Sequence, residues 1–194
     1  MPTNKQKMVF LVMLSVYAAT SAYAQVESEH LQELVGLSAR RLVIAEQVAL
    51  AKWDNGMPVE DALREDQVIG SAMKAGQSRG LDPTSVSNFF RAQIEANKLV
   101  QYSVLADWRR EGRAPDHSPV DLRNTIRAKL DGVDKELIAE LAESRVMRGS
   151  ASCPTDIARA VRKYTSAHTK QFSPLKAIAL DRALATACID VPRE

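Results

Sequence analysis

The sequence predicts an all-α protein with a single domain, and three observations support this. The 194 residues contain only eight glycines and eight prolines and are rich in Ala, Leu, Arg and Glu, which favours helices. Apolar residues recur at intervals of three and four, as on the buried face of a helix, and no segment alternates as a half-buried strand does. A chain of this length is long enough to bury a full hydrophobic core in one domain.

The first 24 residues have the features of a secretory signal peptide. Lys5 and Lys7 precede an apolar run over residues 8–19, and Ala22-Tyr23-Ala24 matches the small-residue pattern of a cleavage site. A run of about 12 apolar residues is shorter than the roughly 20 needed to cross a bilayer. We therefore expect cleavage near Ala24 and a periplasmic or secreted protein, with an uncleaved anchor as the alternative.

The mature domain, residues 25–194, has no excess of either charge. The whole chain has 26 Lys and Arg against 24 Asp and Glu, and removing the first 24 residues removes Lys5 and Lys7 but no acid. Equal numbers of basic and acidic side chains remain, so the charge does not favour nucleic acid or an anionic membrane as a partner. We expect neither partner once the signal peptide is removed.

The six predicted helices of the mature chain are separated by glycine, proline and capping residues. They cover about residues 27–54, 59–79, 83–110, 120–147, 154–163 and 174–189. The first helix ends at Asn55-Gly56-Met57-Pro58, and Pro58 opens the second, which ends before Gly80. The third helix begins at Asp82-Pro83, where an N-cap aspartate is followed by proline at the first helical position.

The last three helices follow a long predicted loop over residues 112–119. Leu130, Leu137 and Leu141 belong to the apolar stripe that predicts the fourth helix. Pro154 and Pro174 each stand where a shorter helix is expected to begin.

Cys153 and Cys188 are the two cysteines, too few for a disulfide scaffold or a four-ligand zinc site. Cys153 stands just before the fifth predicted helix and Cys188 near the end of the sixth. In an exported protein the two are expected to pair, because no third cysteine competes. The bond would close the last two helices into a hairpin, and two free thiols are the alternative.

Basic residues occupy an inward row of the first predicted helix. Arg41 and Lys52 are eleven residues apart, which comes to within about 20° of three full helical turns. Both side chains therefore point the same way, in a row shared with Ala45 and Val48. An unpaired buried charge costs several kcal/mol, so these cations need anionic partners.

Two amides interrupt an apolar row of the third predicted helix in the same way. Asn97 and Gln101 lie one turn apart, between Ile94 and Trp108. The polar residues of these rows could pair with local acids such as Glu46 or snorkel to the rim of the bundle. Taken together, several cations and two amides on inward rows favour a polyanion pocket, and a dicarboxylate would suit it because arginine grips a carboxylate through two hydrogen bonds.

Other kinds of chemistry have no recognisable residues. His30, His117 and His168 show no metal-ligand spacing and are expected on the surface. The chain has no nucleophile-elbow, haem-attachment or zinc-protease motif and no glycine-rich phosphate loop. The sequence therefore favours a site without metal, cofactor or nucleophile.

Four polar positions and their spacing resemble a known family. Arg41, Lys52, Arg64 and Gln101 follow one another at intervals of eleven, twelve and 37 residues. This order resembles the all-helical chorismate mutases, and specifically their secreted, gamma-class branch, over about residues 30–190. Further segments that resemble this branch are Pro58-Val59-Glu60-Asp61, Gln101-Tyr102-Ser103 and Ala106-Asp107-Trp108.

The resemblance implies a six-helix bundle of the all-helical chorismate mutase type that rearranges chorismate to prephenate without a cofactor. This pericyclic reaction needs neither a nucleophile nor a general base. Catalysis then comes from holding a flexible dicarboxylate in its reactive shape and from donors at the ether oxygen, where negative charge develops.

The resemblance also implies the role of each site residue. Arg41 and Arg127 would clamp the two carboxylates, and Lys52 and Gln101 would donate to the ether oxygen. Further substrate-binding residues would be Asp61 and Glu65 at the ring hydroxyl, Arg64 at the same edge, and Asn97 beside Gln101.

The second arginine of the clamp has two candidates. In the secreted branch it comes from a later helix of the same chain, and Arg127 fits that position best, with Arg123 one turn earlier as the rival. The family further implies a homodimer with each site within one chain.

Two other classes of function compete with an enzyme. A periplasmic helical binding protein for a small dicarboxylate would keep the arginine clamp but would not need Lys52 and Gln101 to converge on an ether. A structural helical adaptor would expose an apolar groove and show no activity.

Overall fold

The computed structural model describes residues 4–189, with side chains from Glu29 onward, and this part of the chain contains helices but no strands. The prediction of an all-α protein is therefore confirmed. The elements are α1 (Asn4–Asp54), α2 (Ala62–Gln77), α3 (Pro83–Glu111), the π-helical turn η1 (Leu122–Ile126), α4 (Arg127–Glu143), α5 (Arg145–Arg148), α6 (Cys153–Ala167) and α7 (Pro174–Leu184).

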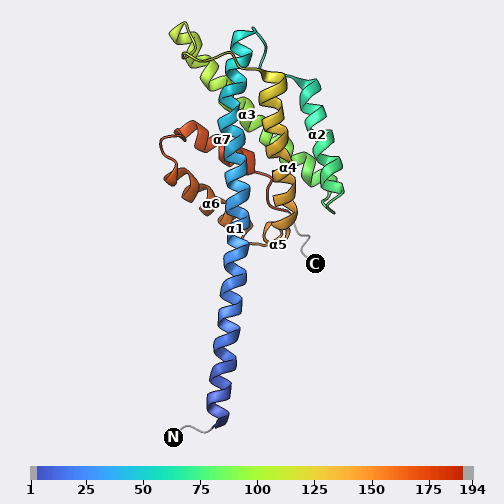
Figure 1. The fold of residues 1–194 in the computed structure, drawn as a ribbon, viewed down its shortest axis with the longest axis vertical. Helices are drawn as coiled ribbons and strands as arrows, with labels where there is room; N and C mark the ends of the chain where they lie inside the picture. The colour runs from blue at the N-terminus through green and yellow to red at the C-terminus, as the bar shows by residue number, and fades with distance from the viewer. Residues whose placement is uncertain (1–3, 190–194) are drawn as a thin grey trace.

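Helix α1 is the axis of the bundle (Figure 1). It packs against α3, α4, α6 and α7, and α2 lies against α3 and α4. The centre of the core is apolar and fully buried; it includes Leu34, Leu42, Phe89, Phe90, Leu137 and Leu180. The helices packed around α1 thus enclose one main apolar core, and a second, smaller cluster contains Val59 and Trp108.

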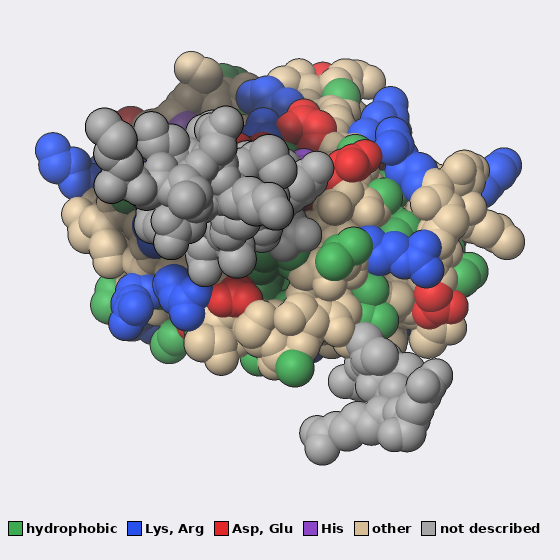
Figure 2. Space-filling view, turned by 90° about the horizontal axis from the view of Figure 1, so that it is seen from below, with side chains coloured by type: hydrophobic (Ala, Val, Ile, Leu, Met, Phe, Trp, Pro, Cys, Tyr) green, Lys and Arg blue, Asp and Glu red, His purple; other side chains and the backbone are tan. Residues whose placement is uncertain are grey.

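The N-terminal part of α1 extends beyond the bundle, so the helix begins well before residue 27 (Figure 1). The cleavage site predicted near Ala24 falls in this part, where the side chains lie outside those that the structure describes. Within the described residues, no helix combines the length and the hydrophobicity needed to cross a bilayer. Seen from this end, acidic and basic side chains are interspersed on the bundle surface (Figure 2).

Helix α2 begins at Ala62, three residues later than the sequence predicts. Asp61 is its N-cap, and the Asp61 carboxylate accepts a hydrogen bond from the backbone N–H of Arg64 at 3.2 Å. Val59 is kept outside the helix because its side chain is buried against Ala49 and Leu105. The segment between α1 and α2 is therefore a packed loop, and it contributes to the site described below.

The sequence predicts one continuous fourth helix over about residues 120–147, and this prediction is wrong. The segment is divided into η1, α4 and α5. Asp121 caps the start by accepting from the backbone N–H of Asn124 at 2.9 Å. At Ser144 the hydroxyl donates to the carbonyl of Glu140 at 2.6 Å, and the chain turns before α5. The bundle thus has seven α-helices in the described residues, where the sequence predicts six.

The disulfide between Cys153 and Cys188 is present, with the two Cα atoms 5.9 Å apart. Cys153 is the first residue of α6, and Cys188 lies beyond α7, which ends at Leu184 and not near Ile189. The buried side chain of Arg148 accounts for the early end: its Nε donates to the carbonyl of Ala187 at 2.6 Å and holds the last residues against the bundle. The predicted C-terminal hairpin closed by a disulfide is confirmed.

Candidate active site

A pocket opens between α1, α2, α3 and the start of α4. Its empty space, including the open solvent at its mouth, amounts to about 630 Å³. Its apolar walls come from each of these elements, and its polar lining consists of Arg41, Lys52, Asp61, Arg64, Glu65, Asn97, Lys98, Gln101 and Arg127. Five of these nine side chains are basic and two are acidic, so the pocket suits an anion.

Arg41 is buried in the pocket wall, with 3% of its surface exposed. Its Nε donates to Oδ1 of Asp134 on α4 at 2.7 Å, so its partner is a distant acid and not a neighbour on its own helix. The Arg41 nitrogen NH1 is buried and has no hydrogen-bond partner within the described part of the protein. The described residues therefore leave the Arg41 guanidinium only partly hydrogen-bonded, on a residue that lines the pocket.

Asn97 and Gln101 form a short hydrogen-bonded chain behind Arg41. The Asn97 Nδ2 donates to the backbone carbonyl of Arg41 at 3.1 Å, and its Oδ1 accepts from Nε2 of Gln101 at 2.7 Å. This acceptor fixes which atom of the Gln101 amide is the nitrogen. One N–H of Gln101 remains for a ligand.

Lys52 lies at the other end of the same α1 row, as its spacing from Arg41 predicts. Its Nζ donates to the backbone carbonyl of Val59 at 2.5 Å, and 6% of the residue is exposed. Burial lowers the pKa of Lys52, although the carboxylates of Asp61 and Glu65 act in the opposite direction. An ammonium group carries three donors, so two remain beyond the bond to Val59.

Two ion pairs join the N-terminal end of α2 to α4. Arg127 donates to Oδ2 of Asp61 at 3.1 Å, and Arg64 donates to Oδ1 of Asp131 at 2.6 Å. Asp61 thus caps α2 and holds Arg127 at the pocket. Arg123, the rival of Arg127, is exposed and does not line the pocket.

Lys98 is a pocket residue that sequence reasoning missed. It forms ion pairs with Glu60, Glu65 and Glu95 at 2.8, 3.4 and 2.7 Å. Burial lowers its pKa, but the hydrogen bonds to Glu60 and Glu95 outweigh this, so the pKa of Lys98 lies above its ordinary value. The same interactions tie the loop before α2 to α3.

The structure brings all eight predicted substrate-binding residues to this one pocket. Two further residues belong to the arrangement, Lys98 in the wall and Asp134 behind Arg41. Both stand on apolar stripes, Lys98 between Ile94 and Leu105 on α3, and Asp134 between Leu130 and Leu137 on α4. A charge on an apolar stripe is the signal that identifies Arg41 and Lys52, and it could have identified these two as well.

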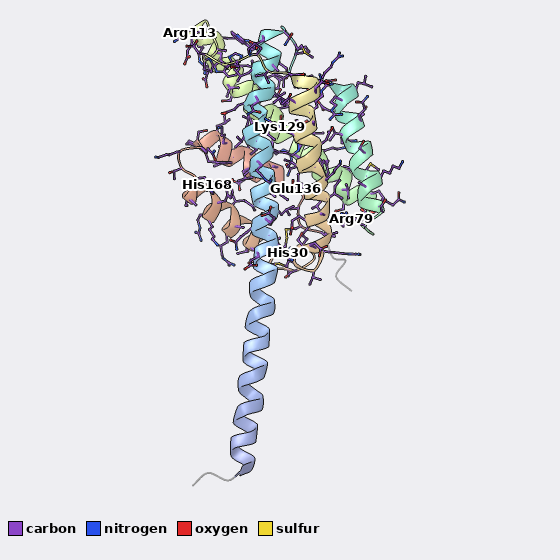
Figure 3. The ribbon with its side chains drawn as sticks, in the orientation of Figure 1. His30, Arg79, Arg113, Lys129, Glu136 and His168 are labelled. Carbon is purple, nitrogen blue, oxygen red and sulfur yellow. A yellow bond between two sulfur atoms is a disulfide. The ribbon has the colours of Figure 1, made fainter. Side chains whose placement is uncertain are left out.

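The three histidines lie away from the pocket. His30 is on α1 where the helix leaves the bundle, and His168 is beyond α6 (Figure 3). His117 and His168 are exposed as expected, but His30 is half-buried and bonds to Glu140 at 2.8 Å. Among the described residues no cluster of His, Cys, Asp or Glu could hold a metal ion.

Fold and pocket together define an all-helical protein with a partly buried pocket in which basic side chains outnumber acidic ones. Residues 32–102 match the family model for chorismate mutase type II. The chain is 30% identical to a secreted chorismate mutase of Mycolicibacterium smegmatis, over 84% of this chain and 88% of that protein. This chain therefore belongs to the all-helical chorismate mutase family.

Solved structures agree with this assignment. The chorismate mutase from Burkholderia phymatum is 38% identical, with a TM-score of 0.79 over 84% of this chain and 99% of that one. The secreted chorismate mutase from Yersinia pestis is 25% identical, with a TM-score of 0.64 over 80% and 94% of the two chains.

Proposed function

We propose that this protein rearranges chorismate to prephenate in the pocket between α1, α2, α3 and α4. The observation that carries the proposal is the convergence of Arg41, Arg127, Lys52 and Gln101 on a single pocket. Two arginines suit the two carboxylates of the substrate, and two uncommitted donors suit its ether oxygen. Family membership supports the same conclusion.

Catalysis in this proposal depends on conformation and electrostatics. Arg41 and Arg127 hold the two carboxylates so that the flexible substrate stays in its compact, reactive shape. Lys52 and Gln101 donate to the ether oxygen as the C–O bond breaks. Because negative charge on that oxygen grows toward the transition state, these two contacts strengthen there and raise kcat.

The remaining polar residues bind and orient. Asp61 and Glu65 lie at the α2 end of the pocket and accept from the ring hydroxyl of the substrate. Arg64, through its ion pair with Asp131, holds the N-terminal end of α2 against α4. Asn97 supports Gln101 through the 2.7 Å bond between their side chains.

The protein is further proposed to act in the periplasm or outside the cell, as residues 25–194 after cleavage near Ala24. The signal-peptide features of the first 24 residues support this, together with relatives that are secreted chorismate mutases. Mass spectrometry of the N-terminus of protein recovered from the periplasm tests it. A mature chain that still begins at Met1 would contradict the cleavage.

We also propose a homodimer in which each pocket is complete within one chain. All eight predicted substrate-binding residues of this chain, Arg127 included, line one pocket, which supports a site built within one chain. Light scattering of the purified protein gives the oligomeric state.

Loss of chorismate absorbance, followed with the purified mature protein, tests the function directly. Turnover without an added metal or cofactor is expected. A dicarboxylate-binding protein would bind chorismate in calorimetry but leave the absorbance unchanged, and a structural adaptor would do neither.

A further inference from the structure

Asp134 is hydrogen-bonded to the proposed site through Arg41. It lies on α4, is 8% exposed, and accepts from Nε of Arg41 at 2.7 Å. Arg41 lines the pocket, whereas Asp134 does not. The carboxylate therefore acts on a ligand by way of the guanidinium.

A second buried arginine shows what a purely structural role looks like in this fold. Arg148 uses all three of its guanidinium nitrogens within the protein, on the carbonyls of Ala187 and Leu141 and the hydroxyl of Ser85. Arg41 instead uses Nε on Asp134 and leaves NH1 buried without a partner in the described residues. A buried donor without a partner costs free energy, so the hydrogen bonds of Arg41, unlike those of Arg148, are not fully explained by the packing of the protein alone.

Arg41 is the cation that pairs directly with Asp134, because the other cation nearby pairs with a different acid. Arg64 on α2 is bonded to Asp131, the acid one turn earlier on α4. Burial raises the pKa of Asp134, and the nearby Arg41 guanidinium opposes this. A buried ion pair of this kind adds little stability compared with an apolar pair of similar volume, so stability alone does not explain it.

The geometry points to Asp134 as a positioning residue, whose carboxylate holds Nε of Arg41 so that the pocket-facing part of the guanidinium meets a carboxylate of the substrate. The inference rests on the proposed function, since it assigns Arg41 to the substrate. Residues that orient a binding group are needed because a displacement of about 1 Å in such a group costs roughly a hundredfold in rate.

Two substitutions of Asp134 distinguish the effect of its hydrogen-bonding oxygen from the effect of its charge. Asp134→Ala removes the acceptor, so we expect KM to rise about tenfold or more, with a smaller change in kcat. Asp134→Asn removes the charge but keeps an oxygen at the same place, so KM should stay within about threefold of the unaltered enzyme. Leu141→Ala, also buried on α4 but outside the pocket, is the matched control and should lower Tm without changing KM.

Two results would overturn the positioning role: an Asp134→Ala enzyme with the original KM, or an Asp134→Asn enzyme as impaired as Asp134→Ala. If Asp134→Ala does not fold, Asp134→Glu replaces it. This variant keeps the charge but moves the carboxylate by one methylene, so KM should again rise, and an unchanged KM would refute the inference.

A double-mutant cycle that combines Asp134→Ala with Arg41→Ala provides a second readout. In an Arg41→Ala background, adding Asp134→Ala should change KM less than about twofold, because the group that Asp134 orients is already gone. An undiminished effect would mean that Asp134 acts by another route. If the unaltered protein neither binds nor turns over chorismate, the proposed function itself fails; turnover with an unaffected Asp134→Ala variant removes only the positioning role.

Discussion

At the residue scale, Lys52 shows most clearly how the pocket differs from an ordinary helix interface. Burial opposes its charge, yet the ammonium keeps two donors beyond the one used on Val59. We predict that Lys52→Ala costs about 3–4 kcal/mol in kcat/KM, mostly through kcat, because it removes a donor to the developing oxyanion. Steady-state kinetics measures this.

The control for Lys52 is Lys129→Ala, which removes an exposed lysine of α4 outside the pocket (Figure 3). It should leave kcat and KM unchanged. A near-normal kcat in Lys52→Ala would refute the proposed role of this residue.

Arg127 and Arg123 provide a matched pair one turn apart. Arg127 lines the pocket and bonds to Asp61 at 3.1 Å, while Arg123 is exposed. We predict that Arg127→Ala abolishes activity, because the second carboxylate loses its clamp, and that Arg123→Ala retains it. The same absorbance assay distinguishes them, and the reverse outcome would exchange their roles.

The residues that sequence reasoning found and missed differ in one physical respect. Arg41 and Lys52 lie on one helix, so the helical period alone aligns them. Asp134 and Lys98 acquire their roles from contacts between helices, with Arg41 across α1 and α4 and with Glu60 across the loop before α2. Spacing along a sequence does not encode such pairings, although each charge does interrupt an apolar stripe.

At the element scale, helix existence was predictable and helix ends were less so. Asp82 caps α3 and Pro83 begins it, as the sequence indicates, because both signals are local. The start of α2 and the end of α7 depend instead on tertiary contacts, which are the burial of Val59 and the hydrogen bond from Arg148 to Ala187. At the start of α2, the burial of Val59 overrides the helix-start signal of Pro58.

The disulfide joins the start of α6 to the segment after α7, and every pocket residue precedes it in the chain. We predict that Cys153→Ser lowers the free energy of unfolding by about 2–4 kcal/mol, because the bond closes a long loop in the unfolded chain. At low temperature kcat should be nearly unchanged.

Thermal unfolding and kinetics of the same preparation measure the two effects of Cys153→Ser. The original protein treated with reductant should behave in the same way. A large fall in kcat at a temperature where the variant is fully folded would mean that the C-terminal hairpin influences the pocket.

At the scale of the whole molecule, α1, α2, α3 and α4 each contribute charged groups to the pocket, and these groups set its pH dependence. Gln101 does not titrate, and Lys52 has a pKa lowered by burial from 10.5. We predict that kcat/KM is flat from about pH 5 to 8 and falls on the alkaline side, with the decline beginning below pH 10.5. The direction follows because deprotonation removes the donor charge of Lys52.

The acidic side of the profile depends on Asp134, whose pKa burial raises above its usual 3.8. As pH falls through that raised value, Asp134 becomes neutral while its carbonyl oxygen can still accept from Nε of Arg41, so KM should rise by no more than about threefold, the limit expected for Asp134→Asn. Tm recorded at each pH separates this titration from unfolding. A histidine-like inflection between about pH 6 and 7 would contradict the assignment, since none of the three histidines lines the pocket.

Gln101→Glu should change the shape of this profile. An amide carries its donors at every pH, whereas a carboxyl group donates only when protonated. The variant should therefore lose kcat/KM as pH rises through the pKa of the new carboxyl, which burial in the pocket raises and Lys52 lowers.

Asn97 adds a second constraint on the Gln101→Glu variant. Its Oδ1 accepts from Gln101 at 2.7 Å, and an ionised carboxylate at position 101 would place two acceptors against each other until the Asn97 amide turned. We thus expect a KM effect in addition to the loss of kcat, both relieved at low pH. Kinetics of the two proteins between about pH 4 and 9 test this, and a Gln101→Glu enzyme as flat as the original would show that residue 101 does not donate to the substrate.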